Sequence, residues 1–458
     1  KIFTVMTFTA WKKTNWIFIK KIITVLTLLL GVVGLRISNS HNKKITNLKC
    51  VHIYKCVHIF FSMKHILLFN TVLILISCNN KPQKNIFTDK QYDYKLVKEN
   101  SVDLNLSVDE YGKSYLDYYQ KTEESSLLYR KGRFENSVVI YDWKQKKRIR
   151  KVNFRNDGPN RIANYAQAAL LPLNDKDHYF IGSVGHIYET LGDSVIHHVK
   201  SIKSNSSDQD SSGNANVFFI NGRNFNPPFE HNNFVYVRTS SSIGDLGSDE
   251  YYSSSQLLKY DIETKKYKQL NLSYPKFYYN KCWGPGRLRI SYTFNPRTEK
   301  LVYLFPTKPT IYVYNLEKEK IIDSVFIKNK NYSKLMPISC SMPTEKQFRH
   351  IYTTPSFNKI VYDQYQDIYY MFATLPITIE KFKSVDNPFG LKPFTIFVLN
   401  NNFNIITEKE FEGGIYFTSE FFVTEEGLWL SKYNPFNKEL KEDILTFDLF
   451  KLHENENK

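Results

Sequence analysis

A polar, Ser-rich segment in the middle of the chain is the sharpest candidate for metal binding. Its sequence, DQDSSGNAN at residues 208–216, keeps the D-x-D-x-S-G start of a calcium loop, with oxygen atoms at Asp208, Asp210, Ser212 and Asn216. Calcium takes about six to eight oxygen ligands, usually including several carboxylates. Only two charged ligands are present, and Phe219 stands where an EF-hand places its bidentate Glu. We therefore favour a solvated loop over a calcium site, and we expect no cofactor.

Two segments combine a Gly-Pro turn with basic or aromatic side chains. They are NDGPNRI at residues 156–162 and CWGPGRLRI at residues 282–290. Glycine permits positive φ and proline stiffens a turn, so ordinary connections between strands are the simpler interpretation. If these loops face the mouth of a channel, four side chains could hold an anionic or sugar-like ligand by charge-assisted hydrogen bonds and stacking. These side chains are Arg161, Trp283, Arg287 and Arg289.

The histidine and acidic residues do not form a pattern typical of catalysis. The sequence has neither a nucleophile elbow nor an H-E-x-x-H motif around its scattered histidines. Asp363 and Asp367 fall within one predicted hairpin, which favours a role in its turn. An acid/base pair would instead need facing positions at a defined separation. We therefore expect no catalytic residue.

Covalent lipid attachment at Cys78 is the chemistry that the sequence supports best. From Met63, a short basic region is followed by an apolar run at residues 66–76 and by LISC at residues 75–78. This order is typical of a secretory signal peptide, and the run is too short to span a bilayer as a helix. The last four residues look like a bacterial lipobox, in which the cysteine is acylated, and several acyl chains anchor stably. The alternative is an ordinary buried cysteine at the end of an apolar strand.

Residues 1–62 do not resemble an ordinary domain. They contain no Asp or Glu, and they carry the near-perfect tandem copies KCVHIY and KCVHIF at residues 49–60. We interpret them as a non-native extension, translated in frame upstream of Met63. The rival interpretation is a membrane segment at residues 22–35, which is short for a span. Residues 63–78 are then the lipoprotein signal peptide, and residues 79–102 form a linker.

The charge of the remaining chain argues against a nucleic-acid partner. Residues 1–78 contain 11 of the 62 basic residues and none of the 45 acidic ones, which leaves a net charge of +6 for the rest. This modest excess provides no footprint for a phosphate backbone. The one dense basic run, residues 144–155, alternates with apolar positions and is typical of charges that protect a sheet edge.

Two cysteines besides Cys78 remain in the mature region, Cys282 and Cys340. In an oxidising periplasm they could pair. Because nothing in the sequence fixes their separation, we favour two free, buried thiols.

A recurring hairpin pattern predicts the fold. Two or three strand-forming residues lead to an aromatic or apolar residue plus Asp or Asn, then to a polar turn and a second strand. Full copies lie at residues 138–154, 257–272, 311–327 and 396–411, a copy cut short by the C-terminus at 444–452, and a weaker one at 186–199. Most copies follow a further pair of candidate strands. Two hairpins make a four-stranded antiparallel meander, which is one propeller blade.

We therefore predict an all-β fold, a six-bladed β-propeller at residues 103–453. The blades are expected at about 103–154, 164–202, 215–272, 285–327, 355–411 and 414–453. Such blades bury their faces only against neighbours, so the ring must close to avoid an exposed edge. We expect residues 92–108 to supply a strand that completes the last blade.

The chain resembles a family of uncharacterised six-bladed propeller lipoproteins of Bacteroidetes. The resemblance rests on Cys78, NDGPNRI at 156–162, LLKYDIETKKYKQLNLSYP at 257–275 and VYDQYQDIYYMFA at 361–373. It implies the fold and the location but no activity. No acidic export signal follows Cys78, which implies a lipoprotein that faces the periplasm, and Asn79 favours the outer membrane.

Two functions from different classes remain open. The first is a lipid-anchored propeller without catalytic activity that binds a protein, peptide or glycan partner through its loops. The second is an enzyme that uses the central channel, such as a calcium-dependent lactonase-like hydrolase. We favour the first, with the membrane contacted only through the anchor.

Overall fold

The computed structural model describes residues 92–455, except residues 111, 133–135, 174–176, 201–218, 221, 241–246, 330–334 and 386–387. Several predictions lie outside these residues and stay predictions. They concern residues 1–62, the signal peptide at 63–78 with Cys78, most of the linker, and the calcium ligands Asp208, Asp210, Ser212 and Asn216. Within the described residues, no helix combines the length and apolar character needed to cross a bilayer.

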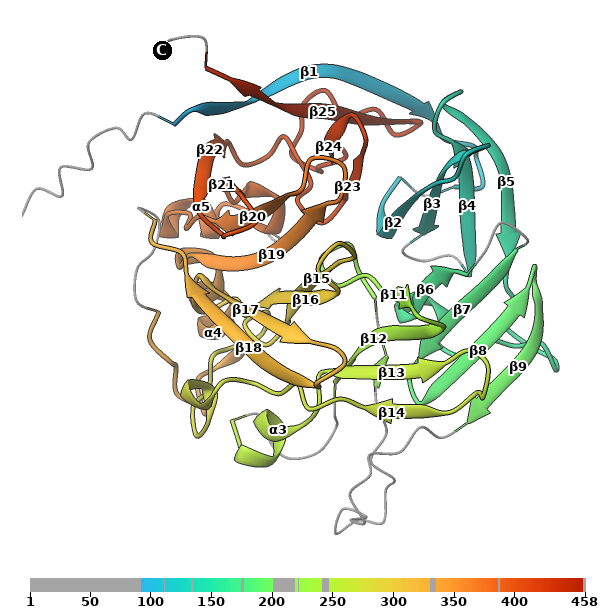
Figure 1. The fold of residues 1–458 in the computed structure, drawn as a ribbon. Coiled ribbons are helices and arrows are strands. Elements are labelled where there is room, and N and C mark those ends of the chain that lie inside the picture. Colours follow the sequence, from blue (N-terminus) through green and yellow to red (C-terminus); the bar gives the residue numbers. More distant parts are fainter. Residues whose placement is uncertain are drawn as a thin grey trace, which may run out of the picture. The chain divides into compact units, whose positions relative to one another are not determined.

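Six antiparallel sheets are arranged in a ring, which confirms the predicted six-bladed propeller (Figure 1). Blade 1 contains β2 (Ser114–Lys121), β3 (Ser126–Gly132), β4 (Ser137–Asp142) and β5 (Lys147–Asn153), and blade 2 contains β6 (Ala169–Pro172), β7 (His178–Ser183), β8 (His186–Leu191) and β9 (Ser194–Lys200). Blade 3 contains β10 (Phe219–Ile220), β11 (Phe229–His231), β12 (Phe234–Ser240), β13 (Leu257–Asp261) and β14 (Tyr267–Gln269). Blade 4 contains β15 (Ser291–Asn295), β16 (Lys300–Leu304), β17 (Thr310–Asn315) and β18 (Lys320–Phe326), and blade 5 contains β19 (Ser356–Asp363), β20 (Ile368–Thr374), β21 (Phe394–Leu399) and β22 (Ile405–Phe411).

Blade 6 joins the two ends of the described chain. It contains β23 (Phe421–Thr424), β24 (Gly427–Ser431), β25 (Ile444–Glu454) and, as its outermost strand, β1 (Tyr94–Asn105). β1 pairs with β25 from Tyr94 opposite Glu454 to Asn105 opposite Ile444, which confirms the predicted closing strand. Residues 103–105, which we had also placed in the first blade, therefore belong to blade 6.

The Asp or Asn of the repeated pattern caps the hairpin turn that follows it. The Asp261 carboxylate accepts hydrogen bonds from the backbone N–H groups of Glu263 (2.9 Å) and Thr264 (3.0 Å). Asn315 and Asp363 cap their turns in the same way. Short polar side chains favour such turns because they satisfy backbone donors locally. The turn role predicted for Asp363 is thus confirmed.

Asp448 occupies the equivalent position in the copy at residues 444–452, but it does not cap a turn. It is fully buried and accepts hydrogen bonds from the Ser101 hydroxyl (2.6 Å) and the Tyr416 hydroxyl (2.7 Å). Lys98 forms an ion pair with it at 2.7 Å. Because Ser101 and Lys98 lie on β1, this carboxylate fastens the closing strand to the C-terminal strand.

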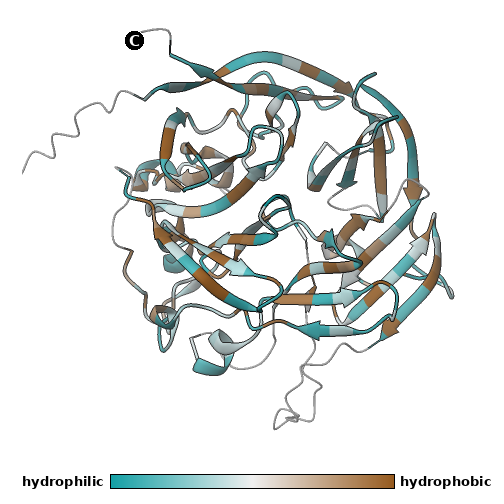
Figure 2. Ribbon diagram, viewed as in Figure 1, coloured by the Kyte–Doolittle hydropathy of each residue, from teal (hydrophilic) through white to brown (hydrophobic). Residues whose placement is uncertain are grey.

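The hydrophobic core is divided into six clusters, each between two neighbouring blades. Figure 2 shows the hydrophobic segments concentrated on the strands. Between blades 6 and 1, Trp143 packs edge-on against Phe422 and Trp429, with ring centroids 4.9 Å and 5.0 Å apart. Since every blade buries both faces against neighbours, the ring is stable only when closed.

The two ends of the strands form two different faces. On the turn face, neighbouring strands are joined by tight connections such as residues 192–193, 232–233 and 364–367. On the long-loop face, the connections include residues 154–168, 270–290, 327–355, 375–393, 412–420 and 432–443. The helical segments lie in or beside these long connections: η1 (Tyr165–Gln167), α3 (Asp249–Ser253), η2 (Lys276–Tyr278), α4 (Thr344–Thr353), α5 (Ile379–Lys383) and η3 (Pro388–Leu391).

Candidate functional site

The long-loop face holds all four side chains predicted to bind a ligand, but it does not gather them into one site. Arg161 lies in the connection between blades 1 and 2, whereas Trp283, Arg287 and Arg289 lie in that between blades 3 and 4. Arg161 and Arg289 are exposed, and Trp283 and Arg287 are buried. A single ligand pocket built from these residues is therefore not supported by their placement.

Arg287 holds the C-terminal end of α4. Its side chain is fully buried and donates hydrogen bonds to the carbonyl of Pro355 (2.6 Å) and to the hydroxyl of Thr354 (2.7 Å). Lys392 donates to the carbonyls of Ile351 (2.9 Å) and Thr354 (3.0 Å). The last carbonyls of a helix lack partners within the helix, and cations are favourable there. Arg287 is thus engaged within the protein, with a structural role that its Gly-Pro loop did not reveal.

Arg161 lies near a pair of histidines in blade 2. His186 Nδ1 and His198 Nε2 are 3.1 Å apart, and the His198 ring stacks on Tyr188 with centroids 4.2 Å apart. Burial and then the positive charges of Lys200 and Arg161 lower the pKa of His186. Burial and His186 lower the pKa of His198 to about 4. The pair is therefore neutral at physiological pH.

A disulfide joins Cys282 to Cys340, with Cα atoms 5.2 Å apart. Our expectation of two free thiols is therefore wrong. The backbone N–H of Ile338 donates to the Cys282 carbonyl at 2.8 Å, so the two loops also pair locally. Gly247 packs over the sulfur atoms, where a Cβ atom would lie 2.9 Å from Cys282 Sγ. The sequence could not show this pairing because 58 positions separate the cysteines.

Residues 222–228 lie across the centre of the ring. The buried Asn224 side chain donates to the Asp117 carboxylate of blade 1 and to the Phe421 carbonyl of blade 6, both at 3.0 Å. The carbonyl of Phe225 accepts hydrogen bonds from the Ser291 hydroxyl (2.6 Å) and the Tyr292 N–H (3.0 Å) of blade 4. This segment, which leads into β11 near the ring centre in Figure 1, therefore connects three blades other than its own.

The Asp117 carboxylate belongs to a buried cluster of charges at the junction of blades 1 and 6. Arg130 Nε donates to Asp117 at 3.0 Å, and Arg130 Nη2 lies 4.0 Å from Glu420 Oε2. Glu420 is fully buried and accepts hydrogen bonds from the Ser114 N–H (2.8 Å) and the Ser431 hydroxyl (3.1 Å). Burial and the nearby Asp117 carboxylate raise the pKa of Glu420 to about 8.

A raised carboxyl pKa is a common feature of catalytic acids, but it also arises where burial alone disfavours charge. Here the carboxyl groups of Asp117 and Glu420 are satisfied by neighbouring blades and have almost no contact with solvent. The cluster thus connects blades 1 and 6. Sequence reasoning missed it because its members are spread from residue 114 to residue 431, with no local motif.

Within the described residues, no group of three or more His, Cys, Asp or Glu side chains is placed to hold a metal ion. The predicted calcium loop lies outside those residues, so it stays a prediction.

Comparison with known proteins relates the chain to a protein family. The family model for a domain of unknown function, DUF4221, matches residues 91–410. A crystal structure of a DUF4221 member from Bacteroides vulgatus superimposes with a TM-score of 0.67 and 22% identity, over 80% of this chain and 100% of that one. No functionally curated protein matches the sequence.

Two other solved structures are less similar to this chain. A candidate exported protein from Bacteroides fragilis has a TM-score of 0.40 and 10% identity, over 80% of this chain and 96% of that one. A calcium-binding protein, regucalcin, from Agrobacterium tumefaciens has a TM-score of 0.38 and 9% identity, over 76% and 93%. The family match spans most of the chain and agrees with the structure. The chain therefore belongs to the DUF4221 family of β-propellers, a domain of unknown function.

Proposed function

We propose that this propeller is a lipid-anchored protein of the outer membrane that faces the periplasm and binds a protein, peptide or glycan partner through its long-loop face. The observation that carries the proposal is the contrast between the two faces. Long connections tied to one another by a disulfide, buried caps and helix contacts lie on one side, and short turns lie on the other. Loops positioned by a rigid scaffold are where binding residues usually occur.

Exposed apolar side chains on the long-loop face support a role in binding. Met336 is 60% exposed, Phe348 44% and Phe389 48%, and each lies in one of the long connections. Apolar side chains left in water are favourable anchors for a partner because burying them releases hydration free energy. Residues 222–228 form hydrogen bonds with blades on the opposite sides of the ring, which also favours ligand contact at the loops over the centre.

The Cys282–Cys340 disulfide supports a location outside the cytoplasm. Disulfides form and persist in oxidising compartments such as the bacterial periplasm. Together with the signal-like sequence that ends at Cys78, it favours export followed by lipid attachment.

The anchor is tested by feeding cells an alkyne fatty acid and comparing the wild-type protein with Cys78→Ala. We expect label and membrane association in the wild type and neither in the variant. The cysteines of the disulfide serve as an internal control, because they remain in both proteins. Equal labelling of the two proteins would exclude Cys78 as the lipidated residue.

The binding face is tested in cells by photocrosslinking. Benzoylphenylalanine replaces the exposed Phe348 on the long-loop face or, as a matched control, the exposed Lys318 in a tight turn of the turn face. We expect a discrete adduct from position 348 and none from position 318. Adducts from position 318 alone, or from neither position, would contradict the proposal.

A further inference from the structure

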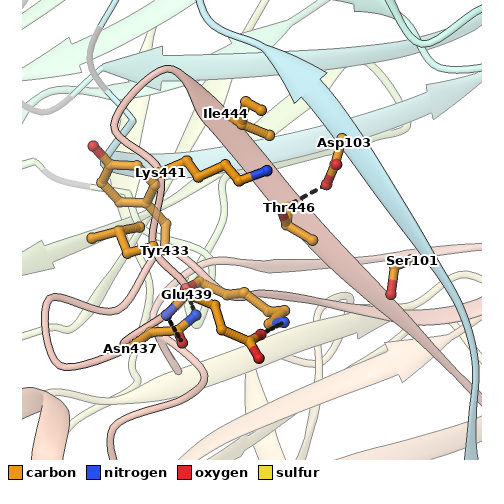
Figure 3. A pocket seen from close by; sticks show the side chains of 10 residues that line it. Ser101, Asp103, Tyr433, Asn437, Glu439, Lys441, Ile444 and Thr446 are labelled. Atoms are coloured by element: carbon orange, nitrogen blue, oxygen red, sulfur yellow. Dashed lines mark hydrogen bonds and ion pairs between the residues drawn. The ribbon is translucent and has the colours of Figure 1, made fainter.

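A cleft at the rim of blade 6 is a separate feature of the long-loop face. Its volume is about 390 Å³, and it lies between the closing strand β1, the start of β25 and residues 432–443 (Figure 3). Small-molecule sites typically occupy about 300–1,000 Å³, so this cleft is at the small end of that range. It is distinct from the apolar positions 336, 348 and 389, which belong to other connections.

The wall of the cleft is preformed by hydrogen bonds. Asn434 is fully buried, and its side-chain amide donates to the carbonyls of Gly390 and Tyr416, both at 2.9 Å. The Asn437 side chain donates to the Lys432 carbonyl (3.0 Å) and accepts from the Glu439 N–H (3.1 Å). A loop held at this many points loses little conformational freedom when a ligand binds.

The charges that line the cleft balance one another. Lys432 Nζ lies 2.8 Å from the Glu439 carboxylate, which forms one ion pair across the wall. Asp103 accepts a hydrogen bond from the Thr446 hydroxyl at 2.6 Å, and Figure 3 shows the Lys441 amine extending toward it. Two acidic and two basic groups therefore leave no net charge to select an ion. The two amines can donate hydrogen bonds to a ligand, and the two carboxylates can accept them.

Apolar surface lies beside these polar groups. The Tyr433 ring is held against the backbone of Gly112, where an added Cβ would approach the ring carbon Cζ to 2.1 Å. Leu440 and Ile444 also line the cleft. The hydroxyl end of this ring lies against Gly112, and Figure 3 shows it pointing away from Asp103 and Thr446. The Tyr433 ring therefore contributes apolar surface to the cleft.

We propose that the cleft between β1 and residues 432–446 binds a short, uncharged saccharide. The hydroxyl groups of a sugar donate to the Asp103 carboxylate and accept from the Lys441 amine, while its C–H face packs against Leu440 and Ile444. The balanced charges match a ligand without net charge. The inference rests on the proposed binding function and deepens it, because it names the class of one ligand and the residues that hold it.

The test uses purified residues 79–458 and saturation-transfer difference NMR. The probes are glucose, galactose, N-acetylglucosamine, maltose and chitobiose, with triglycine as a peptide probe of similar size. We expect saturation of at least one saccharide and none of triglycine. Affinity for that saccharide is then measured by titration calorimetry in three variants.

Ile444→Trp fills the cleft and is expected to abolish binding. Lys441→Ala removes an exposed donor without touching the core, and it is expected to weaken binding about three- to tenfold. Lys438→Ala lies in the same loop but does not line the cleft, so wild-type affinity is expected. A thermal melt of each variant shows whether it remains folded.

The proposal is overturned if no saccharide is saturated, if triglycine alone binds, or if folded Lys441→Ala and Lys438→Ala bind the sugar equally. Crosslinking from position 348 is scored independently. If position 348 gives an adduct but no saccharide binds, only the saccharide site is contradicted. If position 348 gives no adduct, the proposed binding face is contradicted.

Discussion

The turn face and the long-loop face are made by the same strands, yet they are stabilised in opposite ways. On the turn face, an Asp or Asn satisfies backbone donors two or three residues ahead, as Asp261 does for Glu263 and Thr264. On the long-loop face, Arg287 reaches Thr354 and Pro355, and Cys282 reaches Cys340. Local contacts make one face repetitive. Contacts between distant segments give each long connection its own conformation. A surface without repetition is what recognition of a specific partner requires.

The largest effect is expected from removing β1, the strand that closes the ring. A truncation that begins at residue 106 deletes β1, with its pairing to β25 and the buried side chains of Leu96 and Leu104. These losses sum to at least about 5 kcal/mol, which is comparable to the whole stability of an ordinary domain. We expect insoluble protein or no cooperative thermal transition. A truncation that begins at residue 92 keeps β1 and should melt like the parent, and equal melting of both would refute closure by β1.

The next largest effect is expected at the buried cap of α4. Arg287→Ala removes the charged donor to the Pro355 carbonyl and the Thr354 hydroxyl, both part-buried, while Lys392 still donates to the Thr354 carbonyl. Loss of these charged hydrogen bonds should lower the free energy of unfolding by about 2–4 kcal/mol in urea titrations. Lys281→Ala, at an exposed position of the same connection, should change it by less than about 0.5 kcal/mol. Similar effects of the two substitutions would show that burial of Arg287 is unimportant.

The stability of the junction between blades 1 and 6 is expected to depend on pH because the buried Glu420 titrates there. Because its pKa is raised from 4.5 to about 8 in the folded state, the folded protein holds a proton that the unfolded chain releases. Stability should therefore fall as pH rises from about 4.5 to about 8, by at most about 1.4 kcal/mol per pH unit from this group.

The environment of Glu420 sets the design of that test. Asp117, Arg130, Ser114 and Ser431 face the carboxyl group, and Tyr433 lies nearby. Glu420→Gln keeps an acceptor for the Ser114 N–H while removing the titration, so its chemical denaturation should depend less on pH than that of the wild type. Glu426→Gln, at an exposed site, is the control. An unchanged pH slope in Glu420→Gln would contradict the assignment.

The smallest effect is expected on the turn face. Asp261→Ala deletes the acceptor for two backbone N–H groups that water can satisfy instead. We expect a loss of about 0.5–1 kcal/mol, measured by urea denaturation, without change elsewhere in the ring. Asp261→Asn retains the acceptor and should recover most of the loss. A larger effect than that of Arg287→Ala would reverse the contrast between the faces.

The features that could be predicted from the sequence are those that depend on local contacts. The alternating strands and the Asp or Asn before each polar turn are local signals, so the hairpins and the six blades could be predicted. Closure by a strand from residues 92–108 was predicted because a ring of such blades must not leave an exposed edge. Arg287, Glu420 and the Cys282–Cys340 pair act over distances in sequence that no local pattern records. Arg287 was considered as a ligand-binding candidate, beside the simpler interpretation as part of a turn, because exposure could not be inferred from its Gly-Pro loop.

The proposed function requires a rigid long-loop face, and the order of α4 is the most direct measure of that rigidity. None of the residues of this helix is fully buried, and isolated helices of its length are marginal in water. Its order is therefore expected to depend on contacts outside the helix: those of Arg287 and Lys392, those of Tyr352 with Phe382 and Ile377, and the adjoining disulfide. Hydrogen–deuterium exchange should show α4 amides protected like those of the blade strands in the oxidised protein, and exchanging at least about tenfold faster in Cys282→Ser/Cys340→Ser, with the turn at 364–367 unchanged. Equally fast exchange of α4 in both proteins would contradict a rigid long-loop face.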